Sequence, residues 1–366
     1  MKILFLSHTY WDSLYRVGSH HLASSLAQSG HTILYISTPI SLLHYLKFSA
    51  LKDRIVRAGK LFSAQPNLHT YIPLTPVPCG LAVSKGFDCA FPTGIAMRRI
   101  CTDLAIDTFD LVLVDDPKLL GLLRYIRYNK LVYRPTDIYS KMGMKNWRAL
   151  EAHLLERCDA VVATSGPVLE FLNETFAAQK PGLVLVNGVD YELFAQSQPR
   201  PPEYNNERKR CVYVGALDFR FDFDAVYTLA TTRPDVDFYI IGLGEAQQLA
   251  RFSRLANVFF IGSRPYGRVP AYLQHADVGL LPLRQIAANM GRSPMKLYEY
   301  LAAGLPVVAL QTDELRRRNT RRVHCYNNGD ELIAAFDAAL RQRRESYCEP
   351  ELTWLRISQN MLSFIG

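Results

Sequence analysis

Short apolar runs alternate with helical segments along the chain, and this alternation limits the fold more than any other feature. In the first half, the runs lie at residues 3–6, 33–36, 111–114 and 131–133, with helical periodicity in several of the intervals. Runs that are apolar at every position are typical of strands buried on both faces of a parallel sheet. The first half is therefore predicted to be a parallel sheet covered by helices.

The second half repeats this alternation. A polar, proline-rich stretch at residues 196–210 is followed by further apolar runs, which lie at residues 211–214, 238–241, 258–261, 278–281 and 306–310. Several of these runs end in glycine, as at Gly215 and Gly242. The chain is therefore predicted to have the α/β class, with two Rossmann-like, doubly wound parallel-sheet domains.

Residues 293–309, SPMKLYEYLAAGLPVVA, indicate a polar loop, a helix over 294–303, a glycine cap at Gly304 and a buried strand. The unpaired N–H groups at the start of such a helix, with its dipole, favour a phosphate. Lys296 adds a cation, and Glu299 a carboxylate suited to a ribose diol. This segment is therefore predicted to bind a nucleotide sugar.

The pattern Pro-x-Lys-x-x-Glu followed by Ala-x-Gly-x-Pro-Val-Val resembles the donor signature of GT-B glycosyltransferases. Residues 186–190, Val-Asn-Gly-Val-Asp, resemble the segment that follows the interdomain crossing in that family. The resemblance implies two domains facing across a cleft: an acceptor domain at 1–190 and a donor domain at 191–350. It also implies that a C-terminal helix at 351–366 packs back on the first domain.

Residues 295–300, Met-Lys-Leu-Tyr-Glu-Tyr, resemble more closely the donor loop of the membrane-associated glucuronosyltransferases of bacterial exopolysaccharide assembly. Gly291 stands where many retaining relatives, of the large family-4 type, carry a glutamate. The resemblance therefore implies inverting transfer, with an aspartate of the first domain as the base. By its position at a strand end, that aspartate is Asp137.

Other residues remain candidates for the same chemistry. Asp12, the pair Asp115 and Asp116, and His20 could each accept a proton. Aromatic side chains in the first loop could stack on an acceptor sugar, and a glycine there allows close backbone approach; these acceptor candidates are Tyr10, Trp11, Gly18 and His20.

Donor-site candidates lie at strand ends and in the donor loop: Gly215, Arg220, Gly242, Ser263, Arg264, Ser293, Met295, Lys296 and Glu299. Arg264 and Arg292 could pair with the carboxylate of a glucuronate donor. The chain contains no HxxxH or CxxC pattern. We therefore expect no metal and no cofactor besides the UDP-sugar substrate.

A net charge of +8 favours anionic partners. One basic cluster, which accompanies an apolar helical stripe of His44, Phe48, Leu51, Ile55, Ala58 and Phe62, consists of Lys47, Lys52, Arg54, Arg57 and Lys60. Such a helix suits an anionic membrane surface, and a core-packed helix with a solvated basic face is the alternative. The arginines at 316–322 lack interleaved aromatic residues, so no nucleic-acid partner is expected.

The seven cysteines form no CxxC pattern, so neither a disulfide framework nor a zinc cluster is indicated. An apolar strand follows Met1 and Lys2 directly, and neither a signal-peptide core nor a bilayer-spanning stretch is recognised. These features predict a cytoplasmic protein, peripheral on the inner face of the cell membrane.

Taken together, the residues and the resemblance predict an inverting, metal-independent glycosyltransferase of polysaccharide biosynthesis. The donor would be a UDP-sugar, with glucuronate as a candidate sugar, and the acceptor a lipid-linked saccharide. Three alternatives remain open: a retaining GT-B hexosyltransferase, a UDP-sugar 2-epimerase of the same fold, and a sugar-binding protein without catalysis.

Overall fold

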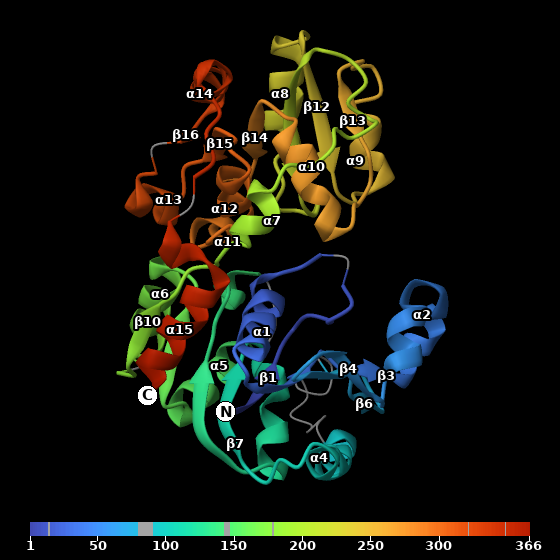
Figure 1. The fold of residues 1–366 in the computed structure, drawn as a ribbon, viewed down its shortest axis with the longest axis vertical. Coiled ribbons are helices and arrows are strands. Elements are labelled where there is room, and N and C mark those ends of the chain that lie inside the picture. Colours follow the sequence, from blue (N-terminus) through green and yellow to red (C-terminus); the bar gives the residue numbers. More distant parts are fainter. Residues whose placement is uncertain (14, 80–90, 143–146, 178, 321, 348) are drawn as a thin grey trace. The chain divides into compact units, whose positions relative to one another are not determined.

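The computed structural model describes residues 1–13, 15–79, 91–142, 147–177, 179–320, 322–347 and 349–366 (Figure 1). They divide into two compact units. Unit 1 comprises Met1–Ser13, Val17–Val186 and Ile357–Gly366, and unit 2 comprises Leu14–Arg16 and Asn187–Arg356. The chain thus enters unit 2 at Asn187, slightly before the predicted boundary at 190, inside the Val-Asn-Gly-Val-Asp segment.

Unit 1 is built on an eight-stranded sheet in the order β10-β9-β8-β7-β1-β2-β5-β4. Neighbouring strands are parallel, except that β4 and β5 are antiparallel. The strands are β1 (Lys2–Leu6), β2 (Thr32–Ile36), β4 (Leu61–Gln65), β5 (Leu68–Tyr71), β7 (Phe109–Val114), β8 (Tyr128–Tyr133), β9 (Ala160–Ala163) and β10 (Gly182–Val184).

Helices flank this sheet in Figure 1. They are α1 (Gly18–Gln28), α2 (Phe48–Arg57), α4 (Phe91–Asp103), α5 (Trp147–Arg157), α6 (Gly166–Phe176) and most of α15 (Trp354–Ile365), with 3₁₀ helices at Leu42–Lys47, Pro117–Tyr125 and Tyr139–Met142. A small parallel pair, β3 (Ile40–Ser41) and β6 (Leu74–Thr75), lies outside the main sheet.

The C-terminal helix α15 contributes its residues from Ile357 onward to unit 1. The Ser358 hydroxyl on α15 lies 3.0 Å from the Ser25 hydroxyl on α1, and both side chains are buried. Lys130 on β8 donates to the carbonyl oxygen of Ile365. These contacts place the end of the chain against the first domain's own elements.

Unit 2 is built on a six-stranded parallel sheet in the order β13-β12-β11-β14-β15-β16. Its strands are β11 (Lys209–Val214), β12 (Val236–Ile241), β13 (Val258–Phe260), β14 (Val278–Leu281), β15 (Val307–Leu310) and β16 (Val323–Tyr326). Its helices are α7 (Tyr191–Ala195), α8 (Phe223–Thr232), α9 (Ala246–Ala250), α10 (Val269–Gln274), α11 (Ala287–Met290), α12 (Met295–Ala302), α13 (Asp313–Arg318) and α14 (Gly329–Arg341), with a 3₁₀ helix at Tyr266–Arg268. The predicted class, two doubly wound α/β domains, is confirmed.

The strands are buried where the sequence is mainly apolar, and β12 also buries Asp237. Every residue of β12, β14 and β15 is buried, and so are Ile3–Leu6 of β1. Phe238 on β12 stacks on Phe336 of α14, with ring centroids 5.6 Å apart. Polar residues lie between the runs, at the ends of the strands, where the candidate site residues also lie.

The predicted membrane-facing stripe on α2 is wrong for its best-described members. Ile55 and Ala58 are buried in a small core with Ile40 and Ile72, because the helix packs its apolar face inward. The side chains of Lys47, Phe48 and Leu51 lie outside the described part of the structure. The alternative stated above, a core-packed helix, therefore fits Ile55 and Ala58.

The cysteine pattern indicates no disulfide, yet the structure records Cys79 as disulfide-bonded. Its partner is not among the other described cysteines, Cys101, Cys158, Cys211 and Cys325, which are free thiols. Within the described residues, no helix is both long enough and apolar enough to cross a membrane.

Candidate functional site

The donor segment adopts the loop, helix, glycine and strand that its sequence predicts. Helix α12 begins at Met295 with Pro294 as its N-cap residue, one position later than expected. Gly304 ends it with a φ of +84°, a conformation that favours glycine, and its N–H donates to the carbonyl of Leu301. The buried strand β15 follows. Met295 and Lys296 therefore lie in the first turn, where backbone N–H groups can face an anion.

Two glycines let Lys296 and the strand ends come close together. A Cβ atom on Gly215, which follows β11, would lie 2.7 Å from Cε of Lys296 and 2.5 Å from the hydroxyl of Tyr213. A Cβ atom on Gly242, which follows β12, would collide with the carbonyl oxygen of Gly215. Glycine is thus required at Gly242 by contact with backbone, whereas the atoms near Gly215 are the ends of side chains, and Lys296 lies over the end of β11.

Three cations gather at this edge of the sheet. Arg220 pairs with Asp218, its Nε lying 3.1 Å from both carboxylate oxygens, and these contacts hold the pKa of Asp218 below its usual range despite burial. Burial lowers the pKa of Lys296, and the nearby charges of Arg292 and Arg220 lower it further against the opposing effect of Glu299. Cations this close to one another favour a bound anion.

Glu299 lies one turn after Lys296 and is 3% exposed. Burial raises its pKa, while Lys296 and a 3.1 Å hydrogen bond from the Tyr266 hydroxyl oppose that rise. Tyr266 packs its ring against Phe194, with centroids 5.7 Å apart. The carboxylate is thus held by its surroundings before any ribose could reach it.

Ser293 and Asn187 join the two motifs that the sequence singles out. The Asn187 amide donates a 2.8 Å hydrogen bond to the carbonyl oxygen of Ser293. Ser293 itself is buried, at 6% exposure. The donor loop is therefore anchored by the segment through which the chain enters unit 2.

Arg264 is not available in the way that the sequence suggests. Its guanidinium pairs with Glu203 at 2.7 Å and donates a 3.0 Å hydrogen bond to the Tyr272 hydroxyl. Because every nitrogen of its guanidinium donates a hydrogen bond within unit 2, Arg264 is a poor partner for a glucuronate carboxylate. The neighbouring Ser263 is half-buried, with its carbonyl accepting from Arg264. Arg292 and Arg220 both lie near enough to Lys296 and Asp218 for their charges to act on these groups.

In unit 1, Asp137 lies in the bend between β8 and the 3₁₀ helix Tyr139–Met142, and it is half-buried. The hydroxyl of Tyr139 lies 2.7 Å from that of Thr136 and donates to the carbonyl of Asp115 at 3.3 Å. Burial raises the pKa of Tyr139 well above its usual value, and the charges of Asp115 and Asp137 add to that rise. These contacts hold the segment that carries Asp137.

The rival aspartates have structural partners. Asp115 is fully buried, paired with Arg134 at 3.2 Å and hydrogen-bonded by the Ser19 hydroxyl. Asp116, also fully buried, caps the following 3₁₀ helix through a 3.0 Å bond from the Lys118 N–H. Asp12 is exposed and pairs with Arg57 of α2 at 2.9 Å. Each of these carboxylates thus has a structural role, and the assignment of the base to Asp137 continues to rest on the sequence resemblance.

The acceptor candidates divide by burial. His20 accepts at Nδ1 from the Val17 N–H at 3.1 Å, and its Nε2 lies 2.8 Å from the Tyr10 carbonyl, so the ring ties the loop after β1 to α1. Trp11 is buried beside His20 and Tyr35. Gly18 is the buried first residue of α1. Tyr10 is half-buried under the Arg54 guanidinium, which lies 3.9 Å from its ring centroid.

Sequence reasoning missed three residues that border these sites. His8 follows β1, packs edge-on against Tyr139 with centroids 6.3 Å apart, and buries an Nδ1 with no hydrogen-bond partner among the described residues. Asp218 pairs with Arg220, and the Tyr266 hydroxyl donates a hydrogen bond to Glu299. The signal for His8 was its place directly after the first strand, where polar residues of α/β proteins often carry function.

Two family models match the chain, one in each half. Residues 5–164 match the N-terminal domain of glucuronosyltransferase GumK, and residues 208–342 match glycosyl transferases group 1. The matches include Asp137 and Lys296, respectively.

Two curated relatives are similar over part of their length. The provisionally named teichuronic acid biosynthesis glycosyltransferase TuaH of Bacillus subtilis strain 168 is 27% identical over 225 residues, which are 58% of this chain and 57% of TuaH. The lipopolysaccharide core biosynthesis mannosyltransferase LpsB of Rhizobium meliloti is 24% identical over 55% of this chain and 60% of LpsB. The chain therefore matches little more than half the length of these relatives.

Solved structures resemble the whole chain at low identity. Sucrose-phosphate synthase from Thermosynechococcus elongatus has a TM-score of 0.71 at 14% identity, over 100% of this chain and 94% of the synthase. Anabaena HepE in complex with UDP-glucose has a TM-score of 0.63 at 17% identity, over 100% of this chain and 95% of HepE. At such identities, these likenesses show a shared two-domain fold.

Proposed function

We propose that this chain, which has the GT-B fold and domains matching two glycosyltransferase families, transfers a sugar from a UDP-sugar to a saccharide acceptor in polysaccharide biosynthesis. The family matches confirm the resemblance recognised in the sequence. The polysaccharide context rests on TuaH and LpsB, whose names place them in teichuronic acid and lipopolysaccharide core synthesis.

The observation that carries the proposal is the cluster of Lys296, Arg220 and Arg292 beside Gly215 and Gly242. Bare backbone allows a diphosphate to approach, and the first turn of α12 supplies N–H groups. The ammonium group of Lys296 is poorly solvated, which lowers its pKa, and it would interact strongly with an anion that replaces water. HepE has been solved with UDP-glucose, which supports a UDP-sugar as donor here.

In the proposed reaction, an acceptor hydroxyl attacks the anomeric carbon as the bond from that carbon to the diphosphate oxygen breaks. Asp137 takes the proton of the hydroxyl, and inversion follows from attack on the face opposite the leaving group. The negative charge that develops on the diphosphate is stabilised by Lys296, Arg292 and the start of α12, without a metal ion. His8, beside Tyr139, is the second candidate base.

The acceptor is proposed to be a lipid-linked saccharide at the inner face of the cell membrane. Exposed apolar side chains on unit 1 support a membrane surface: Leu42 is 66% exposed, Leu43 51% and Val56 53%. Lys52 and Lys60 are exposed nearby in the chain and suit anionic headgroups. Arg54 and Arg57, by contrast, pair with Tyr10 and Asp12.

Retention of anomeric configuration is the second candidate. One solved neighbour, a trehalose-6-phosphate synthase, is described as transferring with retention, and it has a TM-score of 0.60 at 13% identity. NMR of the product's anomeric proton distinguishes the two outcomes. A 2-epimerase would instead convert a UDP-sugar with no acceptor present.

Calorimetric titration with UDP, GDP and a panel of UDP-sugars, with magnesium and with EDTA, tests the donor site. We expect UDP and one UDP-sugar to bind in both conditions, and Lys296→Ala to weaken both. The sugar that binds would name the donor and decide whether glucuronate is correct. Absence of any nucleotide binding would remove the glycosyltransferase proposal.

A further inference from the structure

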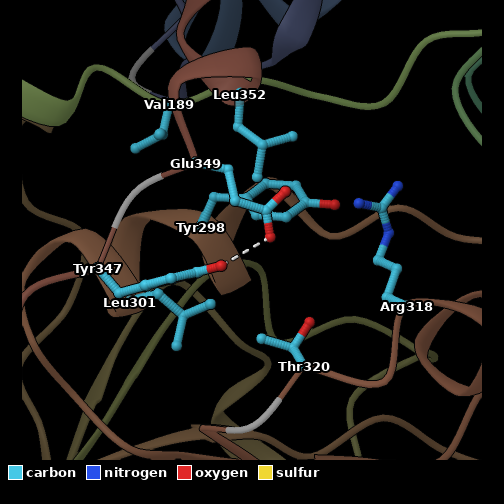
Figure 2. A pocket seen from close by; sticks show the side chains of 8 residues that line it. All are labelled: Val189, Tyr298, Leu301, Arg318, Thr320, Tyr347, Glu349 and Leu352. Carbon is cyan, nitrogen blue, oxygen red and sulfur yellow. Dashed lines mark hydrogen bonds between the residues drawn. The ribbon is translucent and has the colours of Figure 1, made fainter.

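Unit 2 contains a cavity of about 210 Å³ that the donor site does not use (Figure 2). The side chains around it come from α12, from α13 and the loop after it, and from the two segments by which the chain enters and leaves unit 2. They are Val189, Tyr298, Leu301, Arg318, Thr320, Tyr347, Glu349 and Leu352. The cavity is smaller than the about 300 to 1,000 Å³ of sites for drug-sized ligands, so it suits one small ring.

The cavity lies behind the donor helix. Residues of an α-helix are separated by about 100° around its axis, so Tyr298 and Leu301 project from the face opposite Lys296 and Glu299. Tyr298 and Leu301 are buried, at 4% and 3% exposure. A ligand in the cavity would therefore touch the same helix as the donor without occupying the donor site.

One end of the cavity carries a guanidinium that a buried carboxylate pairs on one side, and this end is rich in hydrogen-bond donors. The Arg318 guanidinium lies 5.4 Å from the Tyr298 ring centroid and directs its Nε and Nη2 to a single oxygen of Glu314, at 2.7 and 2.6 Å. Its Nη1 takes no part in that pair. Figure 2 shows the Tyr298 hydroxyl pointing toward Arg318, with Thr320 nearby.

The Tyr298 hydroxyl is the clearest sign of a missing ligand. It is buried and has no hydrogen-bond partner within reach among the described residues. The Ser293 hydroxyl lies near it, and hydrogen bonding between the two lowers the pKa of Tyr298, but among the described residues neither hydroxyl has a partner at full hydrogen-bond geometry. A buried polar group without a partner costs free energy, which a bound acceptor atom would recover.

The other end of the cavity has the opposite character. Glu349 accepts a 3.0 Å hydrogen bond from the Tyr347 hydroxyl (Figure 2). Its carboxylate would repel a second anionic group and accept hydrogen bonds from hydroxyls. Between the two ends, Tyr347, Leu301 and Leu352 offer apolar and aromatic surface of the kind that packs against a sugar ring.

We propose that this cavity is a second small-molecule site, which binds a monosaccharide bearing one anionic group, with the anion at Arg318 and the sugar hydroxyls at Glu349. A hexuronate and a hexose phosphate share this chemistry. On the proposed function, both are compounds related to the precursors of polysaccharide synthesis. The site would therefore regulate sugar transfer.

The site would act on the segments that link unit 2 to the rest of the chain. Val189 donates its N–H to the Leu352 carbonyl at 2.7 Å, and Val189 also forms a parallel bridge with Thr353. A ligand bound against Val189, Leu352 and α12 would hold these segments against the helix that carries Lys296. Occupancy should therefore change the affinity of the donor site.

Thermal unfolding and calorimetry of the full chain test the proposal, with D-glucuronate, glucose 6-phosphate, glucose and inorganic phosphate as probes. We expect one of the two anionic hexoses to raise the unfolding temperature, and glucose and phosphate to have little effect. The probe that raises the unfolding temperature identifies the bound anion as a carboxylate or a phosphate. Stabilisation should persist in Lys296→Ala and in the presence of UDP, because the donor site is separate.

Two variants probe the cavity itself. Tyr298→Phe removes only a hydroxyl and should weaken binding about three- to tenfold, and Arg318→Gln should weaken it more. Arg316→Gln, on the same helix but outside the cavity, is the matched control. Equal binding by Tyr298→Phe and wild type, competition with UDP, or no response to either anionic hexose would each overturn the proposal. UDP binding would still stand in the last case, so the two proposals fail separately.

Discussion

The side-chain amide of Asn187 donates a 2.8 Å hydrogen bond to the backbone carbonyl of Ser293, across 106 positions of sequence. Asn187 is the first residue after the chain enters unit 2, and Ser293 begins the loop that leads into α12. The bond ties the position of this loop, and hence of Lys296, to the entering segment. The two motifs that mark the sequence are thus parts of one structure.

Replacing Asn187 with alanine should weaken UDP binding. Loss of this bond costs about 1 kcal/mol, which corresponds to roughly fivefold in affinity if the loop must be reordered on binding. Calorimetric titration measures the change, with Gln247→Ala, an exposed amide on α9, as the control. Unchanged affinity would mean that the donor loop keeps its conformation without Asn187.

Asp137→Asn should remove turnover while leaving the fold and UDP affinity intact. A general base contributes about 10²- to 10⁴-fold to rate, and asparagine cannot accept the proton. Sugar transfer and UDP binding are measured on the same preparation, with the exposed Asp107→Asn as control. If Asp137→Asn stays active and His8→Gln does not, the base is His8.

Two ion pairs of unit 1 should differ widely in their contribution to stability. Arg134→Met leaves the fully buried Asp115 without its cation and should lower the free energy of unfolding by about 3–5 kcal/mol. Arg57→Met breaks the exposed pair with Asp12 and should lower it by about 1 kcal/mol or less. Thermal unfolding compares them, and equal shifts would contradict the assigned burial of Asp115.

Unit 1 should become less stable as pH rises from about 4.5 to 7. Burial raises the pKa of Glu151 to about 7, against a hydrogen bond from Tyr133 that lowers it. In this window the folded state binds more protons than the unfolded state, so up to about 3 kcal/mol of stability is lost as pH rises. In Glu151→Gln, whose side chain does not titrate, the unfolding temperature should fall less between pH 5 and 8 than it does in the wild type. Identical pH profiles would show that Glu151 is ionised in the fold.

Membrane association should depend on exposed leucines more than on the basic face of α2. The double variant Leu42→Asp with Leu43→Asp should reduce flotation with anionic liposomes, whereas Arg54→Gln with Arg57→Gln should have a smaller effect because those arginines have partners in unit 1. Ile95→Asp, which changes another exposed apolar residue of unit 1, is the control. If the arginine double variant reduced flotation more than the leucine double variant, the basic face of α2 would be the membrane contact.

Some site residues could be placed from sequence because their roles are local. Gly215, Gly242 and Lys296 were predicted from strand ends and from one helix start, and the structure brings them together. Parallel strands end at a common edge, so residues that follow them become neighbours whatever the loops do. The same reasoning placed Asp137 after β8, although its role as base stays a prediction.

Pairings between distant side chains could not be placed in this way. Asp12 with Arg57, Arg264 with Glu203, and Asp115 with Arg134 each join residues from different elements. Nothing in the spacing of these residues shows which loops meet. Each pairing changed how a candidate was interpreted, because a paired charge is stabilised and is less available for catalysis or for a substrate.

The sequence by itself determined the two parallel sheets, the helix and glycine cap of the donor segment, and the family that its motifs resemble. These depend on local periodicity and on backbone conformation, which each short segment carries in its own residues. The tertiary structure decided which cations surround Lys296, that Ile55 and Ala58 face a core, and that a cavity lies behind α12. These depend on burial and on contacts between segments far apart in the chain, which exist only once the units have folded.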